Sequence, residues 1–327
     1  MHRTPLFAKK SDMKKLNRRN FSTTLFSGFC ASTLTAQLNA QVLPVSRTAS
    51  AQKIALNTGT IRGYKLPLAE QIKRVARAGY SGIEPWCNDL AAAAKQDAGL
   101  RDHAKQIADC GLTVVGAIGF AKWAVNDDAA RRAGLEEMKR DLEHVAQLGG
   151  RHIAASPAGV NAPGYTLELT AAAERYHVLL ELGKTFGITP VLEFWGASSN
   201  LNTLQHSLYV AAEARHPDAC ILADVYHLYK GNSALDGLRF LPQTKLPILH
   251  INDYPATPPR ETIRDADRIW PGDGIAPLQQ ILSTLRAIAS TPWFSLELFN
   301  AGYWEKPVDE TLRTGYEKVQ RALACVK

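Results

Sequence analysis

The sequence predicts an α/β fold, a single (β/α)8 barrel with eight parallel strands. From Lys53 onward, short apolar or β-branched runs alternate with longer segments whose apolar residues recur at helical spacing. This alternation occurs eight times in the 276 residues that follow the first 51 of the 327, and such a barrel takes about 250 residues. An open doubly wound sheet is the alternative. It usually carries a glycine-rich dinucleotide loop after its first strand, and Thr58–Lys65 contains no GxGxxG.

Each predicted strand is one of the apolar runs. The strands are Lys53–Gly59, Ser81–Trp86, Leu112–Gly119, His152–Pro157, Thr189–Trp195, Cys220–Tyr226, Ile248–Asp253 and Trp293–Phe299. Helical spacing predicts helices that begin near Leu68, Leu135 and Thr170, and a last helix from about Pro307. Glycines follow the first three of these helices and are expected to end them, at Gly79, Gly149 and Gly187.

The first 51 residues are predicted to be a leader, and residues 52–327 the catalytic barrel. Eight of the 38 Lys and Arg residues precede Gln52, but only one of the 31 Asp and Glu residues does, so 30 of each remain. The barrel is therefore nearly neutral, although the whole chain has a formal net charge of +7. This distribution leaves no strong electrostatic footprint for binding nucleic acid.

The leader resembles a twin-arginine export signal. Arg18-Arg19 in NRRNF precedes a mildly apolar run, and Thr48–Ala51 offers small residues for cleavage. Such a signal predicts an exported, periplasmic protein. The alternatives are a disordered basic tail or a misplaced start codon, with which the protein would be cytoplasmic. Ser, Thr, Gly and Gln interrupt the apolar run, which disfavours a permanent membrane span, and Phe29 before Cys30 disfavours a lipid anchor.

Polar residues follow the apolar runs of four consecutive predicted strands. They are Glu193 in VLE, Asp224 in ILAD, His250 in PILH and Glu297 in FSLE, with Asp253 shortly after the histidine. In a (β/α)8 barrel the active site lies at the C-terminal ends of the strands, and adjacent strands are about 4.8 Å apart. The four side chains are therefore expected to converge. Each of them taken alone also has a structural interpretation, as a paired carboxylate or a structural histidine.

Clustered carboxylates repel one another unless a cation neutralises them. Three oxygen ligands and one imidazole suit a divalent metal ion, namely Mn²⁺, Zn²⁺, Co²⁺ or Mg²⁺. The spacing does not choose among these ions. We therefore expect one divalent metal ion as the cofactor.

Several sequence runs resemble the xylose-isomerase-like barrels, a family of sugar and cyclitol isomerases and epimerases. The runs are LEFWG with LNTL close behind it, LADVYHLYKG, LHIND, DADRIWPGDG and SLELFNAGYW. The resemblance is spread over the barrel and is strongest from Phe186 to Thr314. The four polar residues mark only the superfamily, whereas the DRxWPGxG run together with the last ELF is more specific.

The resemblance implies roles for individual residues. The family's metal ligands match Glu193, Asp224, His250 and Glu297. The pair of residues that moves protons matches Glu193 and Glu297. His227 matches a substrate-contacting histidine, and Arg268 matches a residue that grips substrate oxygens.

Departures from the family pattern fall where the substrate is chosen. Trp195 stands where the cyclitol enzyme has a small aliphatic residue, and Asn300 replaces a basic residue. The early strands match poorly, including Glu84, Trp86, Lys122 and Trp123. Loops in that half set substrate choice in such barrels, so the sequence leaves the substrate open.

Other candidate residues follow from their own chemistry. Trp86, Trp195 and Trp270 are candidates for a sugar-binding wall, with core or rim packing as the alternative. Asp253 and Asp267 are candidates for supporting the site, since either could form an ion pair with Arg268. Such an ion pair is the alternative to substrate contact by that arginine.

The predicted reaction is proton transfer next to a carbonyl group. An α-hydroxyketone of a keto-sugar, or of a keto-cyclitol such as an inosose, would chelate the metal, which stabilises the enediolate formed when the α-proton leaves. One glutamate removes the proton and the other returns it. Return to the neighbouring carbon is isomerisation, and return to the opposite face is epimerisation.

Three alternatives remain open. The same site could expel a leaving group, which would make the protein a lyase or dehydratase acting on a 3-keto-glycoside or a dehydroshikimate-like substrate. A DNA-repair endonuclease of the same fold needs a three-metal site with more histidines, and the early strands offer only His152. A non-enzymatic sugar-binding protein would not need both glutamates. The sequence thus predicts a small-molecule substrate, no nucleic-acid partner and no stable membrane anchor, and it leaves a homo-oligomer open.

Overall fold

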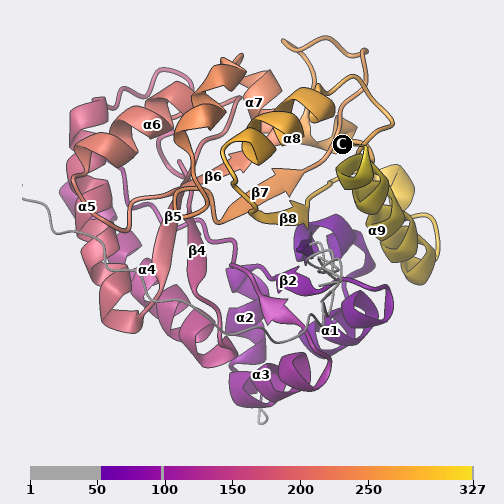
Figure 1. Cartoon of the computed structure of the whole chain (residues 1–327). Coiled ribbons are helices and arrows are strands. Elements are labelled where there is room, and N and C mark those ends of the chain that lie inside the picture. Colours follow the sequence, from indigo (N-terminus) through magenta and orange to yellow (C-terminus); the bar gives the residue numbers. More distant parts are fainter. Residues whose placement is uncertain (1–52, 97–98, 326–327) are drawn as a thin grey trace, which may run out of the picture. The chain divides into compact units, whose positions relative to one another are not determined.

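The computed structural model describes residues 53–96 and 99–325, so the predicted leader and its export signal lie outside the described residues. In the described part, eight parallel strands belong to one sheet (Figure 1). The strands are β1 (Ile54–Asn57), β2 (Gly82–Glu84), β3 (Thr113–Val114), β4 (His152–Ala155), β5 (Thr189–Glu193), β6 (Ile221–Asp224), β7 (Ile248–Ile251) and β8 (Trp293–Leu296). Each lies within a predicted run, which confirms the (β/α)8 fold class.

Backbone pairing closes this sheet into a barrel. The strand order is β3-β2-β1-β8-β7-β6-β5-β4, so the first strand pairs with the last. At the remaining edge, the Ala117 N–H donates to the His152 carbonyl (3.1 Å), and the Ala117 carbonyl accepts from the Ala154 N–H (2.9 Å). β3 is shorter than predicted because the next donor in its ladder with β2 would be residue 85, a proline without an N–H.

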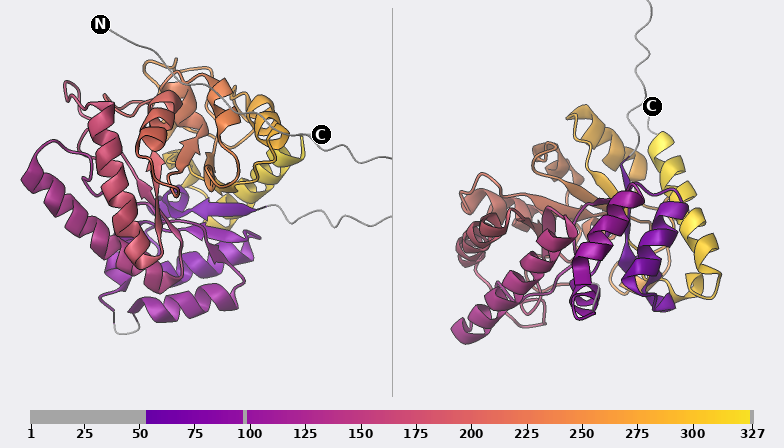
Figure 2. Two further views of the ribbon diagram at one scale, coloured as in Figure 1. Left: turned by 60° about the vertical axis from the view of Figure 1, so that its left-hand side comes forward. Right: turned by 90° about the horizontal axis from the view of Figure 1, so that it is seen from below.

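Helices surround the strands, as the views in Figures 1 and 2 show. The α-helices are α1 (Leu68–Arg77), α2 (Cys87–Ala93), α3 (Gly99–Asp109), α4 (Asp128–Leu148), α5 (Leu169–Phe186), α6 (Leu204–Glu213), α7 (Val225–Lys230), α8 (Leu278–Ala287) and α9 (Val308–Ala324). Short 3₁₀ helices also occur in the loops, at η1 (Thr58–Tyr64), η2 (Leu235–Phe240), η3 (Asp265–Asp267) and η4 (Ala301–Tyr303).

The helix ends follow their capping residues. Gly79, Gly149 and Gly187 have φ angles of 100°, 88° and 69°, which confirms them as left-handed residues after helix ends. α4 begins at Asp128, earlier than the predicted Leu135, because the Asp127 side chain accepts a hydrogen bond from the Ala130 N–H (2.7 Å) and caps the helix. The first two turns of α4 are mainly polar or small, so apolar spacing did not reveal them.

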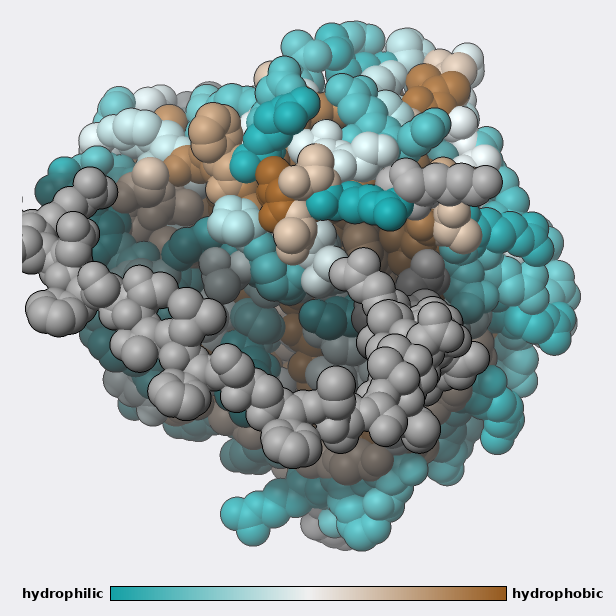
Figure 3. Space-filling model, in the orientation of Figure 1, coloured by the Kyte–Doolittle hydropathy of each residue, from teal (hydrophilic) through white to brown (hydrophobic). Residues whose placement is uncertain are grey.

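Apolar side chains fill the barrel and leave the C-terminal ends of its strands to polar ones. The cluster in the interior consists of Ala55, Val115, Val191, Cys220, Leu222 and Ile248. Larger clusters pack the helices against the outside of the sheet. The visible outer surface is mainly hydrophilic with scattered apolar patches (Figure 3). Among the described helices, none has the length and apolarity needed to cross a membrane.

We predict that Asp141→Asn stabilises the barrel at high pH. Burial, together with the nearby Glu137, raises the pKa of Asp141 to about 6. The folded state therefore holds a proton that the unfolded chain loses near pH 4, and the unfolding free energy falls as the pH rises from about 4 to 6. The substitution should raise the unfolding free energy by about 1 to 2 kcal/mol at pH 8 and hardly change it at pH 4.

Urea titrations at the two pH values measure this effect. Asp236→Asn, at an exposed side chain on η2, is the control for the chemical change itself. An equal effect of Asp141→Asn at both pH values would contradict the ionisation argument.

Candidate metal centre and active site

The strand ends of the second half of the barrel bring four predicted site residues into one buried region. Asp224 and His250 are direct neighbours in the pairing of β6 with β7, and Glu297 directly follows β8. Glu193 ends β5. Each of the four is at most 4% exposed. The predicted convergence of the late strands is therefore present in the structure.

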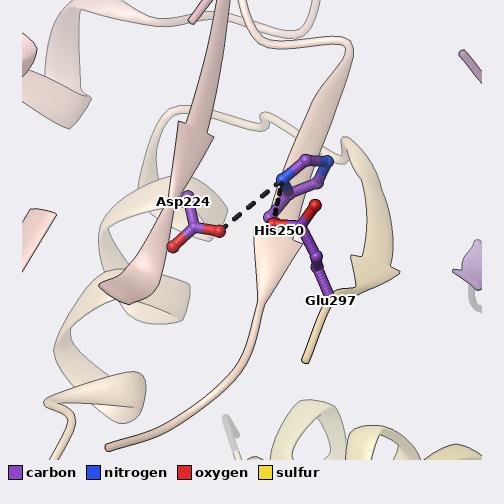
Figure 4. A group of neighbouring side chains, drawn as sticks. All are labelled: Asp224, His250 and Glu297. Atoms are coloured by element: carbon purple, nitrogen blue, oxygen red, sulfur yellow. Dashed lines mark ion pairs between the residues drawn. The ribbon is translucent and has the colours of Figure 1, made fainter. Parts of the chain in front are cut away.

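Three of the four predicted metal ligands form a tight group (Figure 4). One potential ligand atom from each of Asp224, His250 and Glu297 lies within 4.8 Å of the others. The His250 Nδ1 atom is 3.6 Å from Asp224 Oδ2 and 3.1 Å from Glu297 Oε2. This nitrogen has no hydrogen-bond partner, so its lone pair can face a cation.

Glu193, the fourth predicted ligand, lies outside this group of three but beside it. Its Oε2 atom is buried and has no hydrogen-bond partner. Burial raises the pKa of Glu193 to about 8, and the negative charges of Glu297 and Asp224 act in the same direction. A buried carboxylate oxygen without a partner is costly. Glu193 Oε2 and His250 Nδ1, which both lack a partner, are donor atoms that divalent cations bind, so these residues fit a metal site.

Arg268 supplies positive charge to the same carboxylates. One guanidinium nitrogen lies 3.0 Å from Asp224 Oδ2 and 2.8 Å from Glu297 Oε2. The other contacts Asp265. The ion pairs with Asp224 and Glu297 are buried, whereas the Asp265 side chain is half exposed. Arg268 therefore bridges two of the three clustered residues.

The partners of Arg268 correct the sequence analysis, which proposed Asp253 or Asp267. The turn of η3 places Asp265, three residues before the arginine, beside it. Asp267 instead accepts a hydrogen bond from the Arg264 N–H (2.8 Å). Asp253 accepts from the backbone N–H groups of residues 254, 272, 274 and 276, and so holds the loop that follows η3.

The surrounding charges shift the pKa values of the clustered residues in opposite directions. Burial alone raises the pKa of Asp224 and of Glu297, but the positive charges of Arg268 and His250 outweigh burial and hold both below their usual values. Burial lowers the pKa of His250, but the adjacent carboxylates outweigh it and raise this pKa well above its usual value. A cation at the site would compete with the proton on the imidazole.

His227 points a ring nitrogen toward Arg268. Its Nδ1 atom accepts from the Gly196 N–H (3.2 Å), and its Nε2 atom lies 3.2 Å from a guanidinium nitrogen. Burial lowers the pKa of His227 below its usual value. Both ring nitrogens therefore face N–H donors, because a guanidinium has no acceptor, and a neutral ring can accept at only one of them.

A cavity of about 570 Å³ opens onto these side chains. Glu193, Glu297, His227 and Arg268 line its reactive side. Its wall is largely aromatic, with Trp86, Phe120, Trp195, Phe299 and Trp304. Two of the three predicted wall tryptophans, Trp86 and Trp195, therefore lie in this cavity.

Trp270 does not line this cavity. It is buried, and its ring stacks on Tyr303 with centroids 4.2 Å apart. The ring also lies against Gly315 of α9, where a Cβ atom would come within 3.0 Å of it. This tryptophan thus packs η4 and α9 onto the barrel, which is the packing alternative of the sequence analysis.

The sequence analysis missed two side chains of the early strands. Glu84, on β2, accepts a hydrogen bond from His250 Nε2 (2.9 Å). Asn57, on β1, donates to Glu297 Oε1 (2.9 Å). Both are at most 1% exposed. The signal for Glu84 was present, because GIEPW places a glutamate at the end of a predicted strand as LEFW does for Glu193.

Comparisons with known proteins agree with this geometry. The xylose isomerase-like TIM barrel family matches residues 72–320. An inosose isomerase of Bacillus licheniformis is 28% identical over 193 residues, which cover 58% of this chain and 69% of that protein. An inosose isomerase of Bacillus velezensis is 24% identical over 259 residues, which cover 79% and 92% of the two chains.

Solved structures show the same fold. The IOLI protein with a bound zinc atom superposes with a TM-score of 0.78 at 21% identity, over 84% of this chain and 99% of that one. L-ribulose 3-epimerase superposes with a TM-score of 0.67 at 18% identity, over 84% and 95%. Since the family match spans most of the chain, this protein belongs to the xylose isomerase-like TIM barrel family.

Proposed function

We propose that this protein is a metal-dependent isomerase or epimerase that moves a proton next to the carbonyl group of a keto-sugar or keto-cyclitol. One observation carries the proposal. Glu193 at the end of β5 and Glu297 directly after β8 line the same cavity, at the Asp224–His250–Glu297 group. Relatives that are inosose isomerases, and an epimerase with the same fold, support this class of reaction.

The two glutamates would perform the proton transfer. One carboxylate removes the α-proton, and the other returns a proton to the neighbouring carbon or to the opposite face. Both belong to rigid strand ends, so they are held in position for a substrate bound between them. His227 and the guanidinium of Arg268 line the cavity and would bind substrate oxygens, while Trp86 and Trp195 would pack against the carbon skeleton.

Asp224, His250 and Glu297 would hold a divalent cation, with Glu193 as the fourth ligand. Such an ion supplies a Lewis acid that stabilises the negative charge developing on the substrate oxygens. Mn²⁺, Zn²⁺, Co²⁺ and Mg²⁺ all suit these donors. Zinc is the first ion to test, because the structural neighbour IOLI contains it.

Metal removal should destabilise the protein. A divalent ion that binds the folded chain and not the unfolded one stabilises the fold by mass action. At 100 times its dissociation constant it should raise the unfolding free energy by about 2.7 kcal/mol. Thermal unfolding of chelator-treated protein with and without added Zn²⁺ measures this, and elemental analysis should find about one metal ion per chain. His250→Ala is the control and should abolish the gain. Full activity in a metal-free sample would refute the metal site.

Glu193→Gln and Glu297→Gln should fold normally yet lose turnover by about 10²- to 10⁴-fold, because each removes a group that carries the proton. The assay follows inosose, free ketohexoses and 3-keto-glycosides by NMR in D₂O. An isomerase or epimerase leaves solvent deuterium on the substrate carbon. Glu181→Gln, at an exposed glutamate on α5, is the matched control. Near-normal turnover in either site variant would contradict the two-glutamate mechanism.

Elimination is the second candidate. The cavity of about 570 Å³ falls in the range that holds drug-sized ligands, so it has room for a substrate that carries a leaving group beside its sugar ring. The same proton removal would then expel that group, as in a lyase or dehydratase acting on a 3-keto-glycoside. The same NMR assay separates the two, since elimination yields a released group and an unsaturated ketone.

We also propose that residues 1–51 direct export by the twin-arginine route. The support is the NRRNF run with its following apolar stretch. Replacing Arg18 and Arg19 together by lysine should retain the protein in the cytoplasm of a Gram-negative host, while replacing Lys14 and Lys15 by arginine should leave export unchanged. Immunoblots of periplasmic and cytoplasmic fractions measure this. Wild-type protein found only in the cytoplasm would contradict it.

A further inference from the structure

Glu84 sits at the centre of a buried hydrogen-bond network at the end of β2. Its Oε2 atom accepts from His250 Nε2 (2.9 Å), Ser295 Oγ (2.7 Å) and Asn57 Nδ2 (3.3 Å). All four residues are at most 1% exposed. Glu84 does not line the active-site cavity, so it cannot meet the substrate directly. Three donors on a single oxygen fix the position of this carboxylate.

The contact with His250 sets the orientation of the imidazole ring. Because Nε2 donates to Glu84, the ring keeps a proton on this nitrogen and directs Nδ1 toward Asp224 and Glu297 (Figure 4). Nδ1 is the atom without a hydrogen-bond partner. A histidine that binds a metal ion through one nitrogen commonly donates the other N–H to a carboxylate, which fixes the ring and makes it a better ligand.

Asn57 extends the network to a second ligand. Its amide nitrogen donates to both Glu84 Oε2 (3.3 Å) and Glu297 Oε1 (2.9 Å). Its amide oxygen accepts from Trp86 Nε1 (2.9 Å), in the wall of the substrate cavity. The amide is therefore held from both sides. Glu84 thus holds the imidazole of His250, and Asn57 holds the carboxylate of Glu297.

We propose that Glu84 is a positioning residue of the metal centre, acting through His250, and that Asn57 couples it to Glu297. The early strands would then complete a centre whose ligands come from the late strands. This inference rests on the proposed function only in that the Asp224–His250–Glu297 group binds a divalent cation.

Two variants of Glu84 separate its hydrogen bonding from its bulk. Glu84→Met keeps a similar volume and removes both acceptor oxygens, whereas Glu84→Gln keeps one acceptor for His250. With Zn²⁺ alone as the probe, calorimetry should find binding about 10- to 100-fold weaker in Glu84→Met, with Glu84→Gln in between. Ser295→Ala, which removes one donor to Glu84, should weaken binding by a smaller factor and tests the network if Glu84→Met fails to fold.

A second readout reports the ring itself. In zinc-loaded wild-type protein, ¹⁵N-edited NMR should show a protected, downfield Nε2–H signal from His250. Glu84→Met should lose this protection and Glu84→Gln should retain it in part. Asp141→Asn is the matched control, since it removes a carboxylate that is 9% exposed and lies on α4 away from the centre, and it should leave zinc affinity and the signal unchanged.

The outcomes distinguish this inference from the proposed function. If wild-type protein binds no zinc and no other divalent ion, the proposed metal centre itself fails. If the wild type binds zinc and a folded Glu84→Met variant binds it equally well, the positioning role is refuted while the metal centre stands. An Nε2–H signal that is absent from the zinc-loaded wild type would also refute it.

Discussion

Compensation of buried negative charge is the constraint on which the site depends. Four carboxylates, of Glu84, Glu193, Asp224 and Glu297, lie within one region and are at most 4% exposed. In such an interior an uncompensated carboxylate takes up a proton rather than stay charged, as the pKa of about 8 at Glu193 illustrates. Arg268 and His250 compensate part of this charge by direct ion pairs. A divalent cation at the unpartnered atoms would compensate the rest. The same ion would then both stabilise the site and take part in the proposed reaction.

The barrel can hold these charges close together because the backbones of its parallel strands fix the positions of the side chains at their C-terminal ends. β6 and β7 place Asp224 and His250 in register, so their side chains meet without any loop between strand and ligand. Asp224 also caps α7, since its Oδ1 accepts from the His227 N–H (3.0 Å). One carboxylate therefore caps a helix, belongs to the Asp224–His250–Glu297 group and contacts the backbone of the next histidine. Rigid elements of this kind hold a site more precisely than loops do.

The two halves of the barrel contribute different properties. The late strands supply the buried carboxylates and the histidine of the site, whereas much of the cavity wall comes from earlier segments, with Trp86 and Phe120, and from the chain after β8, with Phe299 and Trp304. Trp86 connects the cavity wall with the buried carboxylates. It lines the cavity and donates a hydrogen bond to Asn57, which in turn donates to Glu297. A change at Trp86 would therefore affect both the cavity wall and, through Asn57, a carboxylate of the Asp224–His250–Glu297 group.

The sequence by itself determined the strands, the glycine-ended helices and the four polar residues at the strand ends, because each of these is a local pattern of a few neighbouring residues. Tertiary structure alone decided which of those residues touch. Glu84 reaches His250 across 166 positions of sequence, and Asn57 reaches Glu297 across 240. Both contacts exist only because the sheet closes, with β1 beside β8. Tertiary packing also decided that Trp270 lies outside the cavity, since Tyr303 and Gly315 cover its ring only when η4 and α9 pack on the barrel. Sequence spacing does not predict such long-range contacts, because the geometry of the closed sheet determines them.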